Sequence, residues 1–143
     1  MKKKYPSKVS YGLLLFIFLI FFSPVVFSRD YSKLDLSLVF ALALMTVLYA
    51  VILYLFFQTK YIIHSNLLTI EIGVFTFKSI DIEDIKKISS TNSILSSPAP
   101  SFDRIEIEYG SFGRVIISPK DKLALSKELS RLNPKIENKL KGS

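Results

Sequence analysis

Two long blocks without a charged residue dominate the N-terminal part of this chain. Tyr11–Phe27 and Leu36–Phe57 contain no Asp, Glu, Lys or Arg. A helix rises about 1.5 Å per residue and the hydrocarbon core of a bilayer is about 30 Å thick, so roughly 17–25 apolar residues span it. A chain of 143 residues builds only a small domain, which could not cover two helices that are apolar on every side. The blocks therefore predict a transmembrane helical hairpin over residues 11–57, integral to the lipid bilayer.

The charges around these blocks predict the orientation of the hairpin. Four lysines and no acid precede the first block, whereas residues 28–35 carry two bases and two acids. Short flanks rich in Lys and Arg stay in the cytoplasm. Residues 1–10 are therefore expected to form a basic cytoplasmic tail. The charges therefore predict a multi-pass protein of the inner (cytoplasmic) membrane with both termini in the cytoplasm.

A signal peptide over residues 1–28 is the alternative for the first block. It would have a basic start, an apolar stretch and Val26-Phe27-Ser28 as the cleavage site. The bulky Phe27 and the absence of alanines weigh against cleavage there. In either case the second block remains a span, and the C-terminal domain stays on the same side of the membrane.

The residue types needed for common catalytic and metal sites are scarce. The chain has no cysteine and one histidine, His64. A lone histidine beside scattered carboxylates does not make a metal site, and no nucleophile–base pair or Gly-rich phosphate loop is visible. We therefore expect no enzyme activity and no cofactor.

After the second block, the periodicity changes to that of strands. Alternating apolar and polar residues, broken by short turns at 64–66 and 73–74, are typical of an antiparallel sheet. A Ser- and Pro-rich loop is expected at 91–101. The strands are expected near residues 61–63, 68–72, 75–80, 85–90, 104–109 and 114–117.

A helix is expected after the last strand. Ser118 is a candidate N-cap, with Pro119 at the first helical position and Asp121 three residues after the cap. Leu125, Leu129 and Leu132 follow at i, i+4 and i+7 and predict a core-facing stripe, and Asn133-Pro134 ends the helix. The predicted fold class is α+β: a transmembrane hairpin followed by a curved antiparallel sheet plugged by a C-terminal helix.

The soluble half resembles a known family. The run Ser97-Pro98-Ala99-Pro100-Ser101-Phe102-Asp103-Arg104-Ile105-Glu106-Ile107-Glu108-Tyr109 is similar to the signature of small bacterial pleckstrin-homology-like (PH-like) domains often labelled YyaB-like. The run Val115-Ile116-Ile117-Ser118-Pro119-Lys120-Asp121 and the closing Asn133-Pro134 match its later pattern. The resemblance covers about residues 60–136, with a basic tail at 137–143. It implies a partly open PH-like barrel fused to N-terminal membrane helices, with no defined activity.

The candidate motif or binding residues are Ser101, Asp103, Arg104, Ser118 and Lys120. Arg104 could receive a phosphate or carboxylate through its rigid fork of donors. Alternatively, Asp103 and Ser101 cap the Pro-rich loop while Arg104 pairs with a carboxylate on an adjacent strand, and the sequence favours this structural role.

Two further charge patterns bear on partners. The turn His64-Ser65-Asn66 corresponds to the basic loop of lipid-binding PH domains, yet has no Lys or Arg, so phosphoinositide binding is not expected there. From Lys120 onward seven bases face three acids. These bases either contact the anionic leaflet or form a solvated helix face and tail. Nucleic-acid binding is not expected.

Together these features predict a membrane-anchored protein whose PH-like domain is a non-catalytic module. It would bind an unknown protein partner or the membrane surface. The alternative is a small accessory subunit of a membrane transport or secretion complex, with the helices as the interface.

Overall fold

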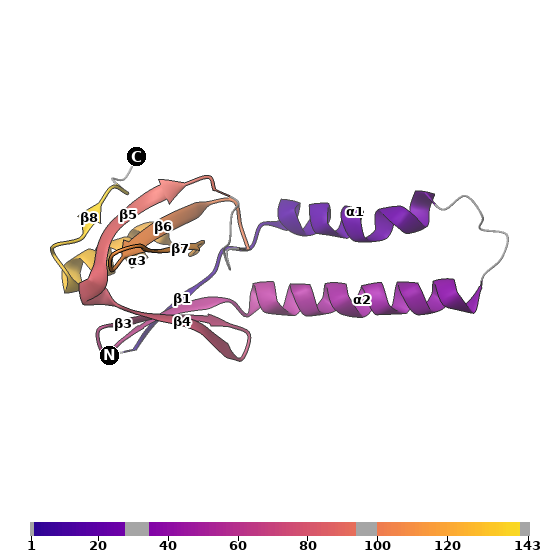
Figure 1. The fold of residues 1–143 in the computed structure, drawn as a ribbon, viewed down its shortest axis with the longest axis horizontal. Coiled ribbons are helices and arrows are strands. Elements are labelled where there is room, and N and C mark those ends of the chain that lie inside the picture. Colours follow the sequence, from indigo (N-terminus) through magenta and orange to yellow (C-terminus); the bar gives the residue numbers. More distant parts are fainter. Residues whose placement is uncertain (1, 28–34, 94–99, 141–143) are drawn as a thin grey trace.

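The chain folds into a β-rich domain from which two long helices extend side by side (Figure 1). This computed structural model describes residues 2–27, 35–93 and 100–140. Three segments of the expected organisation lie outside the described residues: the inter-helix loop at 28–34, most of the Pro-rich loop at 94–99, and the end of the C-terminal tail at 141–143.

The first sheet is antiparallel, in the order β1-β2-β3-β4. Its strands are β1 (Lys3–Pro6), β2 (Lys60–His64), β3 (Leu67–Ile72) and β4 (Phe75–Asp81). Ser65 and Asn66 join β2 to β3 with φ values of 48° and 65°, the left-handed pair of a tight hairpin turn. Gly73, with φ 63°, opens the turn between β3 and β4.

The second sheet has the order β7-β6-β5-β8. It contains β5 (Ile85–Thr91), β6 (Arg104–Tyr109), β7 (Gly113–Ile117) and the short β8 (Glu137–Asn138), which runs parallel to β5. A 3-10 turn, η1 (Ile82–Asp84), links the two sheets, and the Asp81 side chain caps it by accepting a hydrogen bond from the Glu83 N–H.

The two sheets and α3 (Lys122–Leu132) enclose one aliphatic core. Leu125 and Leu129 of α3 are fully buried, as the leucine spacing predicted, but the third leucine of that stripe, Leu132, is 38% exposed because it lies in the last turn of the helix. Outside the named strands, the described residues show one isolated bridge, between Ser7 and Pro119, which joins the two sheets at one corner. The result is an α+β, PH-like arrangement of two sheets rather than a closed barrel. Its fully buried core residues are Tyr61, Leu68, Ile70, Ile82, Ile85, Ile88, Ile105, Ile107, Ile117, Leu125 and Leu129.

The six expected strands are present, and two further strands lie within the segments expected to be tails. Lys3–Pro6 is an edge strand paired with β2, because Tyr5 packs against the core while Lys4 remains exposed. At the other end, Glu137–Asn138 pairs with β5 as β8. The run Lys2-Lys3-Lys4-Tyr5 does not alternate between apolar and polar residues, so the sequence gives no sign of an edge strand before the helices. The two sheets therefore include residues outside the expected 60–136.

The predicted start of the C-terminal helix was wrong. The helix begins at Lys122, and its N-cap is Asp121, whose carboxylate accepts a hydrogen bond from the Ala124 N–H at 2.8 Å. Ser118 cannot cap the helix because it is still part of the strand-like segment that contacts Ser7. Pro119 makes the bridge to the same segment.

The two apolar blocks are helices α1 (Tyr11–Phe27) and α2 (Leu36–Phe57). Pro24 does not end α1, which continues to Phe27. The Tyr49 hydroxyl of α2 donates to the Leu14 carbonyl of α1 at 3.1 Å, and its ring lies against Phe18 and Phe22. By length and composition, α2 is the one described helix that could cross a membrane, and α1, with 17 residues, is shorter.

Candidate functional site

Three of the residues singled out from the sequence, Asp103, Ser118 and Lys120, contact the segment 6–10, which runs from the last residue of β1 to α1. This segment, here called the linker, is held by backbone hydrogen bonds to three parts of the domain. The end of α2, the end of β7 and the loop before β6 each contribute a partner. The bonds are Ser7 N–H to Thr59 O (3.1 Å), Lys8 N–H to Ser118 O (2.7 Å), Ser10 N–H to Pro100 O (3.0 Å) and Lys120 N–H to Pro6 O (2.9 Å).

The contacts between the linker and the domain are here called the junction. Ser118 lies at its centre and is fully buried. Its N–H donates to the Tyr61 hydroxyl at 3.0 Å, and its carbonyl accepts from the Ser7 hydroxyl at 3.0 Å. The Ser7 hydroxyl is also 3.1 Å from the Tyr61 hydroxyl. Burial raises the pKa of Tyr61, which remains a neutral hydrogen-bonding hydroxyl in this setting. The serine predicted as a helix cap instead ties the linker to the core.

Asp103 adds a charged layer to the same junction. Its carboxylate lies 2.7 Å from Lys122 Nζ of α3 and 2.9 Å from Lys8 Nζ of the linker. Hydrogen bonds from Lys122 and then from Lys8 lower the pKa of Asp103. All three side chains are partly exposed, so the pairs mainly fix geometry and contribute little to stability.

Arg104 is buried and serves the loop that precedes it. Its guanidinium donates to the carbonyls of Ser101 and Ser93, the latter at 2.9 Å from Nη1. The Ser101 hydroxyl accepts from the Asp103 N–H at 3.2 Å, which caps the turn before β6. These contacts favour the structural interpretation of the motif. The sequence predicted a carboxylate on an adjacent strand as the partner of Arg104. In these contacts, Arg104 instead donates to backbone carbonyls of the loop.

Lys120 joins the junction through its backbone alone, and its side chain is exposed. Across the described ranges, no buried side-chain nitrogen or oxygen lacks a hydrogen-bond partner. The junction is therefore a satisfied polar network that positions the helices, without a spare group aimed at a ligand.

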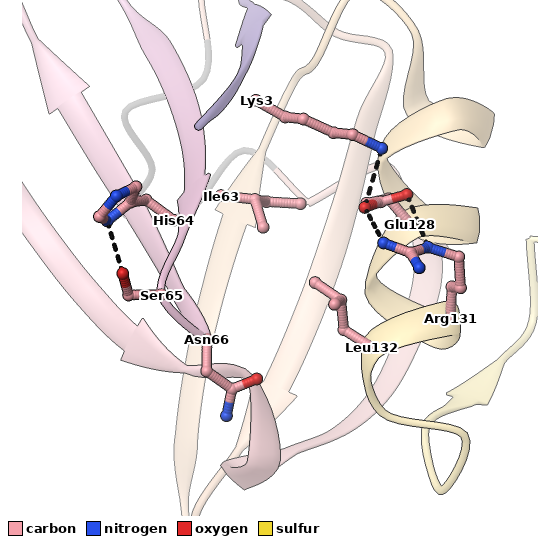
Figure 2. A pocket seen from close by; sticks show the side chains of 8 residues that line it. All are labelled: Lys3, Ile63, His64, Ser65, Asn66, Glu128, Arg131 and Leu132. Atoms are coloured by element: carbon pink, nitrogen blue, oxygen red, sulfur yellow. Dashed lines mark hydrogen bonds and ion pairs between the residues drawn. The ribbon is translucent and has the colours of Figure 1, made fainter. Parts of the chain in front are cut away.

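A groove of about 280 Å³ lies elsewhere, between the β2–β3 turn and α3 (Figure 2). Ile63 and Leu132 point toward each other across it, and one rim is polar. It lies at the end of the domain away from the two long helices (Figure 1). The lining residues are Lys3, Ile63, His64, Ser65, Asn66, Glu128, Arg131 and Leu132.

Glu128 organises the polar rim of this groove. It accepts from Arg131 at 2.8 and 3.2 Å and pairs with Lys3 Nζ at 2.9 Å. The Arg131 and then the Lys3 hydrogen bonds lower the pKa of Glu128 to about 2. Because Lys3 and Arg131 face the single carboxylate of Glu128, the rim carries a net positive charge. The base of the groove is apolar, formed by Ile63 and Leu132. Such a groove suits a partner that offers an apolar side chain beside an acidic one.

The sequence did not single out this groove. The spacing of Glu128 and Arg131 signals a local helix pair, but nothing local places Lys3 against α3. The turn at His64 has no Lys or Arg of its own, but Lys3 of β1 and Arg131 of α3 line the same groove. His64 itself is exposed, with Nδ1 2.9 Å from the Ser65 hydroxyl. No group of three or more His, Cys, Asp or Glu residues within the described segments could hold a metal ion.

The buried Tyr61 hydroxyl gives a test of the junction. Tyr61→Phe leaves the Ser118 N–H without its acceptor, and we expect a loss of stability of about 1–3 kcal/mol. Amide exchange at Lys8 should accelerate, because its acceptor is the Ser118 carbonyl. Tyr109→Phe is the control, since its hydroxyl has no partner among the described residues. Hydrogen exchange of the purified full-length protein measures both, and equal protection of Lys8 in the two variants would contradict this account.

The groove predicts a specific response to acid. A carboxylate whose folded pKa is depressed stabilises the fold above its unfolded pKa, and that contribution is lost as the pH falls through the folded value. The advantage of the native protein over Glu128→Gln should therefore shrink as the pH falls from about 4.5 toward about 2. Thermal midpoints across this range measure it. Glu137→Gln, in the exposed pair with Lys139, is the control, and a pH-independent difference for Glu128→Gln would refute the assignment.

A comparison with known families identifies the domain. Residues 59–133 match the family described as Bacterial PH domain, and the match runs from the start of β2 to the end of α3. It covers more than half of the chain. No curated protein and no solved structure gives a significant match. With its two sheets, its plugging helix and this match, the chain belongs to the bacterial PH domain family.

Proposed function

We propose that this protein holds a PH domain at the cytoplasmic face of a membrane through the hairpin of α1 and α2. The observation that carries the proposal is helix α2. It has 22 residues and no charge, and none of its most apolar window is buried within the protein. Its exposed side chains, such as Phe40, Leu44 and Val47, would face water without a bilayer. The contact of Tyr49 with α1 supports an antiparallel pair.

The distribution of charge supports the cytoplasmic side. The lysines before α1 belong to the domain end of the hairpin, through β1 and the linker. Lys60 follows α2 at the same end. Basic residues close to a span favour the cytoplasm, whereas residues 28–35 at the far end are neutral overall.

The role of the domain in this proposal is binding rather than catalysis. PH domains are in general binding modules, and the family membership of residues 59–133 supports that role. The groove between the β2–β3 turn and α3 is at the end opposite the helices (Figure 1). It would therefore face the cytoplasm, where a protein partner can reach it.

Single cysteines test the topology, because the chain has none of its own. Lys127→Cys places a thiol on the exposed face of α3, and Ser37→Cys places one in the first turn of α2. A membrane-impermeant maleimide should label Ser37→Cys in intact bacterial cells. Lys127→Cys should react only after permeabilisation. Labelling of Lys127→Cys in intact cells would refute the cytoplasmic placement.

A photo-crosslinking residue tests the groove as a protein-binding site. We expect Leu132, on the groove, to yield a defined protein adduct in cells, and the exposed Lys86 of β5 to yield none as the matched control. Arg131→Glu should weaken the adduct by reversing the charge of the rim. Equal adducts at both positions would contradict groove recognition. Adducts from positions in α2 alone would favour the accessory-subunit alternative.

A further inference from the structure

The turn between β3 and β4 packs against the last turn of α2. A Cβ built on Gly73 would lie 3.3 Å from Leu55 Cδ2 and 3.3 Å from Tyr54 Cε1, so the backbone of the turn touches these helix side chains. Figure 1 shows the tip of the β3–β4 hairpin beside the domain end of α2. The turn is therefore at a known position along the proposed span.

The residues that follow Gly73 expose apolar side chains. Val74 is 79% exposed, Phe75 71% and Phe77 55%. Phe75 and Phe77 lie two residues apart on β4, and Phe77 lies at the bulge where the pairing of β4 with β3 shifts. β4 is also an edge strand. Three large apolar side chains within four residues of a tip form a patch rather than isolated surface residues.

The depth of this patch follows from the helix geometry. Tyr54 precedes the end of α2 by three residues, which is about 4.5 Å along the axis. The first charged residue after α2 is Lys60. The tip therefore lies level with the transition from the uncharged span to the first lysine, the zone in which aromatic side chains settle at a membrane interface.

The loop tied to the start of α1 carries a third exposed aromatic residue. Phe102 is 54% exposed, and its loop is tied to the residue before α1 through the hydrogen bond from Ser10 N–H to Pro100 O. The exposed Lys120 lies nearby, bonded through its backbone to Pro6. Aromatic residues thus flank both helices where they meet the domain.

We propose that the β3–β4 tip, defined by Val74, Phe75 and Phe77, inserts into the interface of the bilayer that α2 crosses. The occupant of this apolar patch is the lipid of the protein's own membrane. The contact adds a third attachment point beside the two helices and restrains the tilt of the domain relative to the membrane plane. The inference rests on the proposed membrane anchoring.

Single tryptophans test the insertion, because the chain has no tryptophan. Three variants of the full-length protein are reconstituted in vesicles of zwitterionic and anionic lipid. Phe75→Trp reports on the tip and Leu48→Trp on the middle of α2. Phe112→Trp is the matched solvent control, since Phe112 is 97% exposed in the β6–β7 turn. We expect Phe75→Trp to emit at shorter wavelength than Phe112→Trp and to lose emission in lipids brominated near the headgroup, while Phe112→Trp is unaffected.

The Leu48→Trp variant separates failure of the inference from failure of the anchoring. If Leu48→Trp is not quenched by lipid brominated deep in its acyl chains, the membrane anchoring itself is refuted. If Leu48→Trp is quenched and Phe75→Trp behaves like Phe112→Trp, the anchoring stands and the insertion is overturned. Blue-shifted but unquenched emission from Phe75→Trp also overturns it, because a second protein surface would then cover the tip. Phe77→Trp repeats the measurement if Phe75→Trp does not fold.

Discussion

The backbone hydrogen bonds of the linker are the constraint on which the rest of this structure depends. Residues 6–10 pass between the end of α2, the end of β7 and the loop before β6, and they bond to each. The first helix therefore starts where the second one ends. The linker continues β1, which pairs with β2, directly into α1. A continuous strand–linker–helix path makes the hairpin and the domain one unit.

The polar residues that surround the linker hold it against the domain. Tyr61, Ser118 and Ser7 form a buried hydroxyl cluster, and Asp103 joins the linker to α3 through two lysines. Arg104 holds the loop in place through its carbonyls. A buried network in which each group has a partner specifies one arrangement, because any displacement leaves a desolvated group unpaired. The signature residues thus encode how the domain sits on its helices.

The two ends of the domain offer different chemistry to their surroundings. The end next to the helices exposes Phe75, Phe77 and Phe102, with lysines close by. The opposite end has the groove with its positive rim of Lys3 and Arg131 around Glu128. An aromatic surface suits a lipid interface, and a groove with a charged rim suits a protein segment. The proposed contact with lipid is therefore at the end next to the helices, and the proposed binding of a protein partner is at the opposite end.

Much of this architecture could be predicted from residue patterns alone. The apolar blocks are helices, the period-2 segments are strands, and the Leu125 and Leu129 spacing gives the core face of α3, because each signal is local. The edge strand β1, the helix start at Lys122, the role of Ser118 and the groove were out of reach. Each depends on residues that meet across more than fifty positions, such as Ser7 with Ser118 or Lys3 with Glu128. Periodicity reports which face of an element is buried, but only the packed chain decides which distant element covers it.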